Sequence, residues 1–315
     1  MKIWREADGA STEPMSGPSV VTIGNFDGVH RGHRHVLARA RSLAGVLGRH
    51  GPLPVVAVTF DPHPLEILAP EHAPLRLSTL DRRIALLREA GADHIYILAF
   101  SKEMSALTPD EFVKLVLVDQ LHAVGVVIGE NFRFGHKAAG NIAFLREVGD
   151  DMGFAVDGLA LDGGDVAFSS TLVRNLVADG NVKAAAEVLG HPHSIDGTIV
   201  KGDQRGRELG FPTANVPADS DVAVPADGVY AGWLIRADGE RLPAAISVGT
   251  NPTFDGVERR VESYVLDRTD LDLYGEHIRV EFIERLRGQV RFTGVEDLIV
   301  TIEQDVADTR EILGL

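Results

Sequence analysis

Short β-rich runs alternate with longer helical patterns through the first half of the chain, and this rhythm restricts the fold more than any other feature. Strands that alternate with helices are typical of a parallel sheet in a doubly wound α/β domain. The run 124–129 is apolar at almost every position, as expected of a strand covered by helices on both faces. The expected strands are 20–26, 55–60, 94–99 and 124–129, and the expected helices are 34–47, 80–90, 109–121 and 141–148.

The alternation of strands and helices ends after two short expected helices, 171–178 and 182–189. Beyond them, strands are separated by Gly, Pro and Asp turns, which favours a small antiparallel β-barrel. The expected strands are 228–236, 244–248, 261–266 and 278–283, followed by a C-terminal helix over 295–313. At 315 residues the chain exceeds the usual size of one hydrophobic core, so we expect two domains, 1–188 and 189–315.

The charge balance restricts the partners of the chain. Lys and Arg number 31 against 46 Asp and Glu, which gives a formal net charge of −15. Such a field repels polyanions, so we expect no nucleic-acid partner. A small anion such as ATP remains compatible, because backbone N–H groups and one Mg²⁺ can reverse the potential inside a single pocket.

The chain contains no cysteine, which excludes a disulfide framework, a thiolate nucleophile and a cysteine-ligated zinc. Residues 1–18 include acids and no apolar core of signal-peptide length, and no later apolar run approaches the length of a membrane span. We therefore expect a cytoplasmic protein without a membrane partner, and leave its state open between monomer and homo-oligomer.

A loop with two glycines begins at the end of the first expected strand and leads into a helix. Its candidate phosphate-contacting residues are Gly24, Asn25, Phe26, Asp27 and Gly28. Small residues let a phosphate approach the backbone at a helix start. His30 and His33 lie three apart there, so both can project toward one anion and stabilise charge on a transferring nucleotidyl group and on leaving pyrophosphate. Taken alone, the pair also fits two polar loop residues or a fortuitous metal pair.

The motif at 30–33 resembles the His-x-Gly-His motif of the nucleotidyltransferase superfamily, whose members transfer AMP or CMP on a doubly wound fold. With the segments 59–64, 129–135 and 169–174, the chain resembles the bacterial bifunctional riboflavin kinase/FAD synthetases. This resemblance implies flavin contacts at Phe60, Pro62 and His63, a position near the flavin for Asn131, and phosphate contacts at Ser170, Thr171 and Arg174.

Each of these segments also has a plain structural interpretation. Asp-Pro-His-Pro at 61–64 forms a rigid loop in most proteins. The Ser-Ser-Thr run at 169–171 fits the start of a helix, where such residues cap. Phe132 and Phe134 fit a hydrophobic core.

A second informative run, 197–215, is first glycine-rich and basic and then rigid. Gly202, Gly206 and Gly210 can expose backbone N–H groups to phosphate oxygens, although the run lacks the Walker spacing. Thr213 and Asn215 are uncharged oxygen donors two positions apart, so in an extended segment both point to one side and can hold a hydrated Mg²⁺. The alternative is a simple turn capped by Asn215.

Glu262 is flanked by apolar positions in an expected strand. Its carboxylate can serve as a general base at a barrel mouth, because the ribityl 5′-hydroxyl must lose a proton as it attacks the γ-phosphate. The alternative is a carboxylate that only faces solvent.

The resemblance extends to the riboflavin kinase half through 227–230, 247–253 and 272–275, and so covers about 18–313. It implies metal and phosphate contacts at Thr213 and Asn215 and a catalytic base at Glu262. Further implied cofactor contacts are Arg207, Phe211, Pro212 and Arg291. Asn131 and Asn251 differ from the residues that many relatives carry at these positions. These two differences resemble the actinobacterial-type branch of the family, so we expect the chain to belong to that branch.

The expected function is flavin cofactor synthesis in two Mg²⁺-dependent steps. Riboflavin and ATP give FMN and ADP in the C-terminal half, and FMN and ATP give FAD and pyrophosphate in the N-terminal half. One alternative is a monofunctional kinase whose N-terminal half has lost transfer activity. Another is a flavin-binding regulator or carrier that catalyses neither step.

Overall fold

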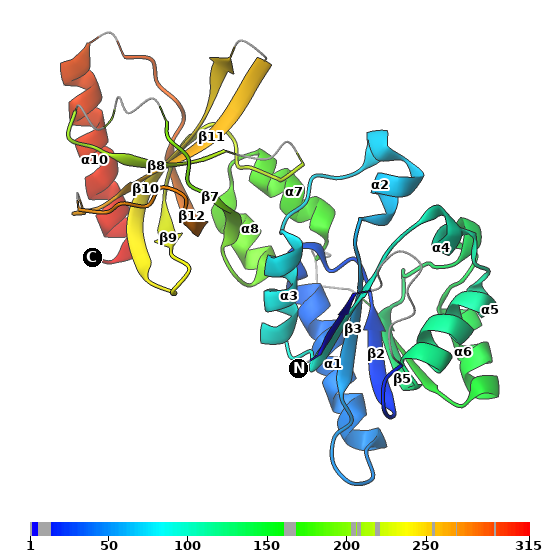
Figure 1. Ribbon diagram of the computed structural model, residues 1–315. Helices are drawn as coiled ribbons and strands as arrows, with labels where there is room; N and C mark the ends of the chain where they lie inside the picture. The colour runs from blue at the N-terminus through cyan, green and yellow to red at the C-terminus, as the bar shows by residue number, and fades with distance from the viewer. Residues whose placement is uncertain are drawn as a thin grey trace. The chain divides into compact units, whose positions relative to one another are not determined.

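The computed structural model describes residues 2–5, 14–160, 168–202, 206, 209–217, 221–253, 256–268, 270–292 and 294–315. Its contacts divide the chain into two compact units (Figure 1). The first unit comprises Met1–Pro74 and Leu80–Phe168, and the second comprises Leu75–Thr79 and Ser169–Leu315. The domain bounds expected from the sequence, 1–188 and 189–315, remain a prediction.

The first unit is built on a parallel six-stranded sheet in the order β1-β4-β3-β2-β5-β6. Its strands are β1 (Ile3–Arg5), β2 (Ser19–Ile23), β3 (Val55–Phe60), β4 (His94–Leu98), β5 (Ala123–Gly129) and β6 (Ala155–Leu159). The chain moves outward from β2 in both directions, through β3 on one side and β5 on the other. In open α/β sheets, ligands bind beyond the carboxyl ends of the strands at such a reversal of strand order.

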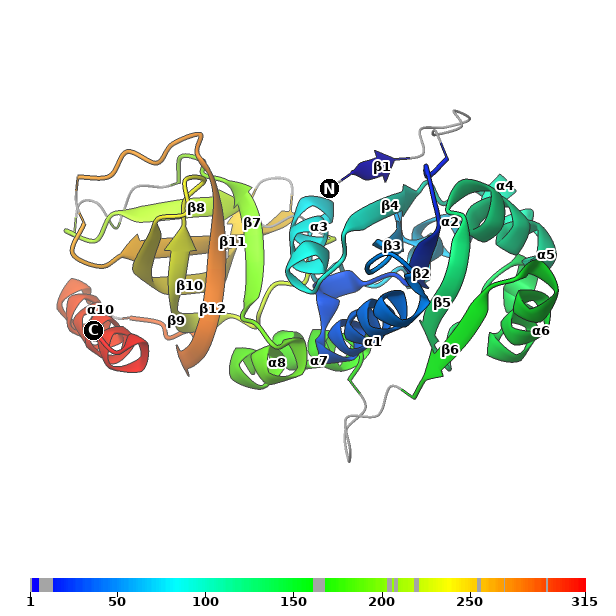
Figure 2. The ribbon, with the colours of Figure 1, turned by 90° about the horizontal axis from the view of Figure 1, so that it is seen from below.

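Helices cover both faces of this sheet (Figure 2). Neighbouring residues of one strand enter different cores, because side chains alternate across a sheet. Val20 packs with α1 (Arg31–Leu47) and α3 (Leu80–Glu89), whereas Val21 packs with the helices of the other face. Those helices are α5 (Pro109–Phe112), η3 (Val113–Gln120) and α6 (Ile142–Met152). The expected doubly wound fold is confirmed.

Short elements complete the first unit. They are η1 (Asp27–Val29), α2 (Pro64–Leu68), η2 (Pro70–His72), α4 (Lys102–Ala106) and η4 (His136–Ala138). The single helix expected over 109–121 is one α-helical turn followed by a π-helix. The edge strands β1 and β6 are additions to the expected set. β6 is interrupted by Asp157 and Gly158, which hide the apolar run that marks a buried strand.

The second unit contains an antiparallel sheet in the order β7-β12-β9-β10-β11-β8. Its strands are β7 (His193–Thr198), β8 (Thr213–Pro217), β9 (Gly228–Ile235), β10 (Arg241–Thr253), β11 (Gly256–Val265) and β12 (His277–Arg287). Just past β7, the N–H of Val200 donates to the carbonyl of Asn215 on β8 at 2.9 Å. The two edges of the curled sheet therefore meet, which confirms the expected barrel.

Three helices belong to the second unit: α7 (Ser170–Ala178), α8 (Val182–Leu189) and α10 (Val295–Leu313). The guanidinium of Arg287 on β12 fastens α10 through two short contacts with the carboxylate of Asp305, at 2.8 and 2.7 Å. Asp305 is buried. Paired geometry of this kind suits a guanidinium and a carboxylate, so one ion pair fixes the helix to the sheet.

A short segment from the first half of the sequence also belongs to the second unit. The N–H of Arg76 donates to the carbonyl of Asp221 at 2.7 Å, and the N–H of Ala223 donates to the carbonyl of Arg76 at 2.8 Å. Arg174 on α7 donates to the carbonyl of Leu75 at 2.6 Å. The segment Leu75–Thr79 is thus held by backbone pairing to residues far away in sequence.

Candidate active sites

The loop after β2 turns sharply before α1. Phe26 (φ 49°) and Gly28 (φ 73°) both adopt a left-handed backbone, which glycine accepts without strain and a bulky residue adopts only when its surroundings hold it. Phe26 is buried in the core on the α1 face. Packing of its ring therefore fixes the shape of the loop formed by Gly24, Asn25, Phe26, Asp27 and Gly28.

His30 and His33 lie together at the start of α1. Their rings stack with centroids 3.6 Å apart, and the rings of Phe26 and His33 form a T-shaped pair with centroids 5.1 Å apart. His30 is the N-cap of α1, and its Nδ1 accepts from the N–H of His33 at 3.4 Å. This contact places the proton of a neutral His30 ring on Nε2, which becomes a hydrogen-bond donor. We call His30, His33 and Gly24–Gly28 the edge site.

The surroundings of His33 disfavour its protonated form. Burial is the main cause of its lowered pKa, and the nearby His30 and Arg83 lower the pKa further. Its Nδ1 is buried and has no hydrogen-bond partner among the residues that the structure describes. A multiply charged anion at the helix start would relieve both conditions, because it accepts hydrogen bonds and favours the protonated ring.

The residues predicted beside the flavin follow the carboxyl ends of neighbouring strands. Pro62 and His63 come directly after β3, and the peptide bond before Pro62 is cis. Nε2 of His63 lies 3.0 Å from the amide nitrogen of Asn25, so this segment meets the loop of the edge site. Phe60 is buried against Phe100. Asn131 is exposed on the turn after β5, the other neighbour of β2.

Arg83 is a residue of this region that the sequence analysis missed. It lies on α3 and is only 3% exposed. Its Nη1 donates to the carbonyl of Phe60 at 2.9 Å and to the hydroxyl of Thr59 at 3.2 Å. The signal was present, because helical spacing puts Arg83 on the same face as the core residues Leu86 and Leu87.

Ser170, Thr171 and Arg174, the predicted phosphate contacts, lie on α7 in the second unit. Ser169 caps this helix, its hydroxyl accepting from the N–H of Leu172 at 3.1 Å. The capping interpretation is therefore correct for that serine. Ser170 and Thr171 occupy the first turn of α7, at the positive end of the helix dipole, which favours an anion.

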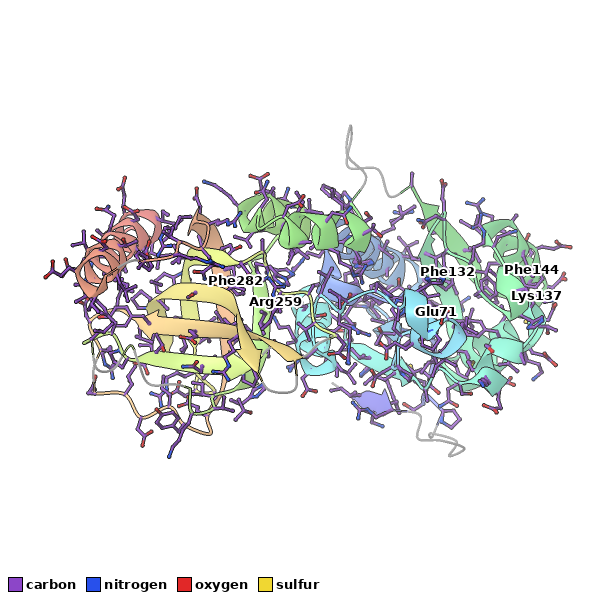
Figure 3. All side chains as sticks on the ribbon, turned by 90° about the horizontal axis from the view of Figure 1, so that it is seen from above. Glu71, Phe132, Lys137, Phe144, Arg259 and Phe282 are labelled. Carbon is purple, nitrogen blue, oxygen red and sulfur yellow. The ribbon has the colours of Figure 1, made fainter. Side chains whose placement is uncertain are left out.

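Phe132 and Phe134 have the structural role that the sequence analysis gave as an alternative. Phe134 is buried, stacks on Phe132 and meets the edge of Phe144 on α6. Figure 3 labels Phe132 and Phe144, and Phe144 lies on α6 at the outer side of the first unit. These rings belong to the hydrophobic core.

Thr213, Asn215 and Glu262 come together on neighbouring strands of the barrel. Glu262 on β11 is directly opposite Asn215 on β8, and directly opposed residues point to the same face. The Thr213 hydroxyl donates to Oε2 of Glu262 at 3.4 Å, and Nδ2 of Asn215 donates to Oγ1 of Thr213 at 3.2 Å. The segment is extended, as the Mg²⁺ hypothesis required. We call these three residues the barrel site.

Gly202 packs directly against the side chain of Asn215. A Cβ atom at Gly202 would lie only 2.5 Å from Oδ1 of Asn215, so no other residue fits there without displacing the amide. Asn215 is 5% exposed, and its Oδ1 has no hydrogen-bond partner among the described residues. An oxygen that is buried and without a donor is suited to a cation.

A cavity adjoins the barrel site. Its lining includes Gly202, Pro212, Thr213, Asn215, Ser263 and Arg268. The hydroxyl of Ser263 is buried without a hydrogen-bond partner in the described part of the chain. The cavity therefore offers unsatisfied oxygens to a polar ligand, while the guanidinium of Arg268 on its wall is paired with Asp270. Sequence reasoning did not single out Ser263 or Arg268.

The other predicted contacts lie around this site or outside the described residues. Phe211 precedes β8, meets the edge of Tyr264 and donates its N–H to the carbonyl of Gly206 at 2.8 Å. Gly210 stands between them with a φ of 89°. Arg291 is exposed after β12. Arg207 lies outside the described residues.

Two family models match the chain in the order expected from the sequence. A FAD synthetase model matches residues 12–171, and a riboflavin kinase model matches residues 189–313. A bifunctional riboflavin kinase/FMN adenylyltransferase of Escherichia coli K12 is 39% identical over 100% of this chain and 99% of its own length. The chain belongs to the bifunctional riboflavin kinase/FMN adenylyltransferase family. The expected family is thereby confirmed, whereas the actinobacterial-type branch stays a prediction.

Further relatives agree on the extent of the similarity. The bifunctional enzyme of Pseudomonas fluorescens is 39% identical over 93% of this chain and 92% of its own length. A crystal structure described as a macrolide-efflux protein from Streptococcus pneumoniae has a TM-score of 0.85 at 32% identity, over 95% of both chains. Among the described residues of this family member, no helix is long and apolar enough to cross a membrane.

Proposed function

We propose that the edge site transfers AMP from ATP to FMN. The stacked His30 and His33 at the start of the 17-residue helix α1 carry this proposal, because a helix N-terminus with two imidazole donors suits a triphosphate. An oxygen of the FMN phosphate attacks the α-phosphorus of ATP, the bond to the bridging oxygen of the β-phosphate breaks, and pyrophosphate leaves. Nε2–H of His30 stabilises the charge that develops.

In this proposal neither histidine is a nucleophile. His33 is neutral before ATP binds, since burial lowers its pKa, and it becomes a better donor as the triphosphate approaches. Asn25, Pro62 and His63 border the flavin end of the site. The phosphate contacts that the resemblance implies for Ser170, Thr171 and Arg174 stay a prediction. Neutral hydrogen-bond donors that gain charge only with substrate avoid repulsion inside the empty site.

We propose that the barrel site phosphorylates riboflavin. Glu262 accepts the proton of the ribityl 5′-hydroxyl. The oxygen of that hydroxyl attacks the γ-phosphorus of ATP, the bond from this phosphorus to the β–γ bridging oxygen breaks, and ADP leaves. Thr213 beside Glu262 keeps the carboxylate oriented. Gly202, Gly206 and Gly210 leave space for phosphates, and Arg207 and Arg291 stay predicted cofactor contacts.

The donor set of the barrel site fits Mg²⁺. Oδ1 of Asn215, Oγ1 of Thr213 and phosphate oxygens are hard oxygen ligands, and Mg²⁺ is typically held by few protein groups with waters and phosphates. Bound there, the ion would neutralise charge on the ATP phosphates. Oδ1 of Asn215 and Oγ1 of Thr213 would hold the ion, and Glu262 would accept the proton.

Two substitutions test the division of labour. Glu262→Gln is expected to lower riboflavin phosphorylation at least about a hundredfold, as for loss of a general base, while pyrophosphate release from FMN and ATP persists. His30→Ala is expected to have the reverse effect, so that FMN accumulates. Glu303→Gln and His50→Ala, at exposed positions, are the matched controls. Equal loss of both activities in either variant contradicts the two-site proposal.

The same assay separates the alternatives. A monofunctional kinase makes FMN without releasing pyrophosphate, and a flavin-binding regulator binds flavin without turnover. We also propose a cytoplasmic location and small-molecule partners only, in keeping with the net charge of −15. Sedimentation measures the oligomeric state, which this proposal leaves between monomer and homo-oligomer.

A further inference from the structure

Arg83 brings a permanent positive charge beneath the edge site. It is 3% exposed, although arginine is among the residues that are rarely buried. Burial weakens screening by water and salt, so its charge acts over a longer distance than a surface charge. Such a position is costly for the fold unless the guanidinium is well bonded.

The hydrogen bonds of Arg83 lead to the loop of the edge site. Its Nη1 donates to the hydroxyl of Thr59 at 3.2 Å, and that hydroxyl donates to the carbonyl of Asn25 at 3.0 Å. A hydroxyl has one proton to donate, so the donation from Arg83 directs the Thr59 proton toward Asn25. The relay therefore joins α3 to the loop that follows β2.

The same nitrogen also fixes the second segment of the site. Nη1 of Arg83 donates to the carbonyl of Phe60 at 2.9 Å, the residue after which Pro62 and His63 follow. His63 in turn lies against the Asn25 amide. One buried cation thus restrains both loops that border the proposed FMN and ATP positions.

Arg83 is also electrostatically coupled to a histidine of the site. After burial and His30, its charge is the third cause of the lowered pKa of His33. Removing the charge of Arg83 should therefore raise the pKa of His33, whereas a lysine at the same position should leave it low. This difference separates a charge effect from a loss of structure.

We propose that Arg83 is a positioning residue for nucleotidyl transfer, which holds the Asn25 and Phe60 loops in place through Thr59 and supplies the buried positive charge toward which the triphosphate binds. This role rests on the function proposed for the edge site. It lies outside the motifs that the sequence analysis used.

The test compares Arg83→Gln, Arg83→Lys and Thr59→Val in the full chain. Pyrophosphate release from FMN and ATP gives kcat and KM, riboflavin phosphorylation by the same sample reports intact folding of the second unit, and ring NMR follows the titration of His33.

Arg83→Gln should lower kcat/KM for ATP about a hundredfold and raise the pKa of His33. Arg83→Lys and Thr59→Val should lower kcat about tenfold and leave the His33 titration unchanged. Arg82→Gln, which changes the neighbouring buried arginine, is the matched control.

The outcomes are separable. If the unmodified enzyme releases no pyrophosphate, the proposed function of the edge site is wrong, and the His33 titration still tests the charge effect. If it does release pyrophosphate, an Arg83→Gln variant with an unchanged rate or an unchanged His33 titration overturns the inference. Should Arg83→Gln fail to fold, normal kcat values for both Arg83→Lys and Thr59→Val overturn the relay.

Discussion

Single atoms mark the two proposed sites more clearly than whole side chains do. Nδ1 of His33 and Oδ1 of Asn215 are buried without a hydrogen-bond partner among the residues described. A buried polar atom left without a partner costs about 1–3 kcal/mol, so a fold keeps one only where something compensates. In both places the missing partner fits a group of the substrate complex: a phosphate at His33 and a cation at Asn215.

The protonation of His33 makes stability dependent on pH. Its pKa in the folded protein is lowered, mainly by burial, while an unfolded histidine titrates near about 6.5. Between these two values the unfolded chain binds more protons, so the stabilising contribution is complete above about 6.5 and is lost as the pH falls below that value. Urea unfolding of the first unit between pH 5 and 7.5 measures the effect.

His33→Gln is the control for this prediction, since it removes the titrating group. The slope of stability against pH should decrease in that variant. An identical slope in both proteins would show that other groups determine the pH dependence.

Gly202→Ala should disable the barrel site selectively. A Cβ atom at this position meets Oδ1 of Asn215 at 2.5 Å, so the amide must move. A displacement of about 1 Å at a reacting group can lower a rate about a hundredfold, and riboflavin phosphorylation should fall about tenfold to a hundredfold. Pyrophosphate release from FMN and ATP should stay within about twofold. Gly288→Ala is the control, because its nearest neighbour lies at 3.9 Å; equal effects of the two substitutions refute the prediction.

At the scale of elements, one ion pair determines how the C-terminal helix is attached. Arg287 and Asp305 join β12 to α10, with Asp305 8% and Arg287 23% exposed in their side chains.

The chain has two tryptophans, Trp4 on β1 and Trp233 on β9, so each unit carries its own fluorescent residue. Unfolding of the two units can therefore be followed separately in Trp4→Phe and Trp233→Phe backgrounds.

Asp305→Ala should destabilise the second unit by about 3 kcal/mol, the lower end of what breaking a buried ion pair costs, because Arg287 stays partly accessible to water. The transition seen through Trp233 should move to lower urea concentration. The transition seen through Trp4 should not move. Glu303→Ala, at an exposed position on the same helix, should leave both transitions in place, and a shift of both by Asp305→Ala contradicts the assignment.

Elements with a strong periodic pattern were predicted closely, and weakly patterned ones were not. β3 and α10 have the bounds expected from the sequence, 55–60 and 295–313. β1 has only three residues, and the π-helix η3 has an apolar pattern that an α-helix would share. At the sites, motif spacing gave His30, His33, Thr213 and Asn215. Arg83 was missed, although its helical spacing to Leu86 and Leu87 indicates a buried position, because an arginine in a helix is ordinarily exposed.

At the scale of the whole molecule, sequence order and folding unit differ. Leu75–Thr79 lies between α2 and α3 of the first unit, yet it pairs with residues 221–223. No local pattern predicts such a pairing, since it depends on two segments about 145 residues apart. The segment joins the chain after His63 to the helix that carries Arg83.

Hydrogen exchange tests whether Leu75–Thr79 unfolds with the second unit. The amides of Arg76 and Ala223 are hydrogen-bonded across it, so their protection should decrease together with that of β9 when Asp305→Ala destabilises the second unit. The amide of Val58 in β3 should keep its protection. If Arg76 instead follows Val58, the segment belongs to the first unit.

The pairing of Arg76 with Asp221 and Ala223 also limits how a gene for this family member can be divided. A cut near residue 188 would separate the two family matches, but it leaves Leu75–Thr79 on the product that contains β3. The other product then exposes the carbonyl of Asp221 and the N–H of Ala223 to water. A single reading frame thus supplies the second unit with a backbone hydrogen-bonding partner that a separate gene would have to replace.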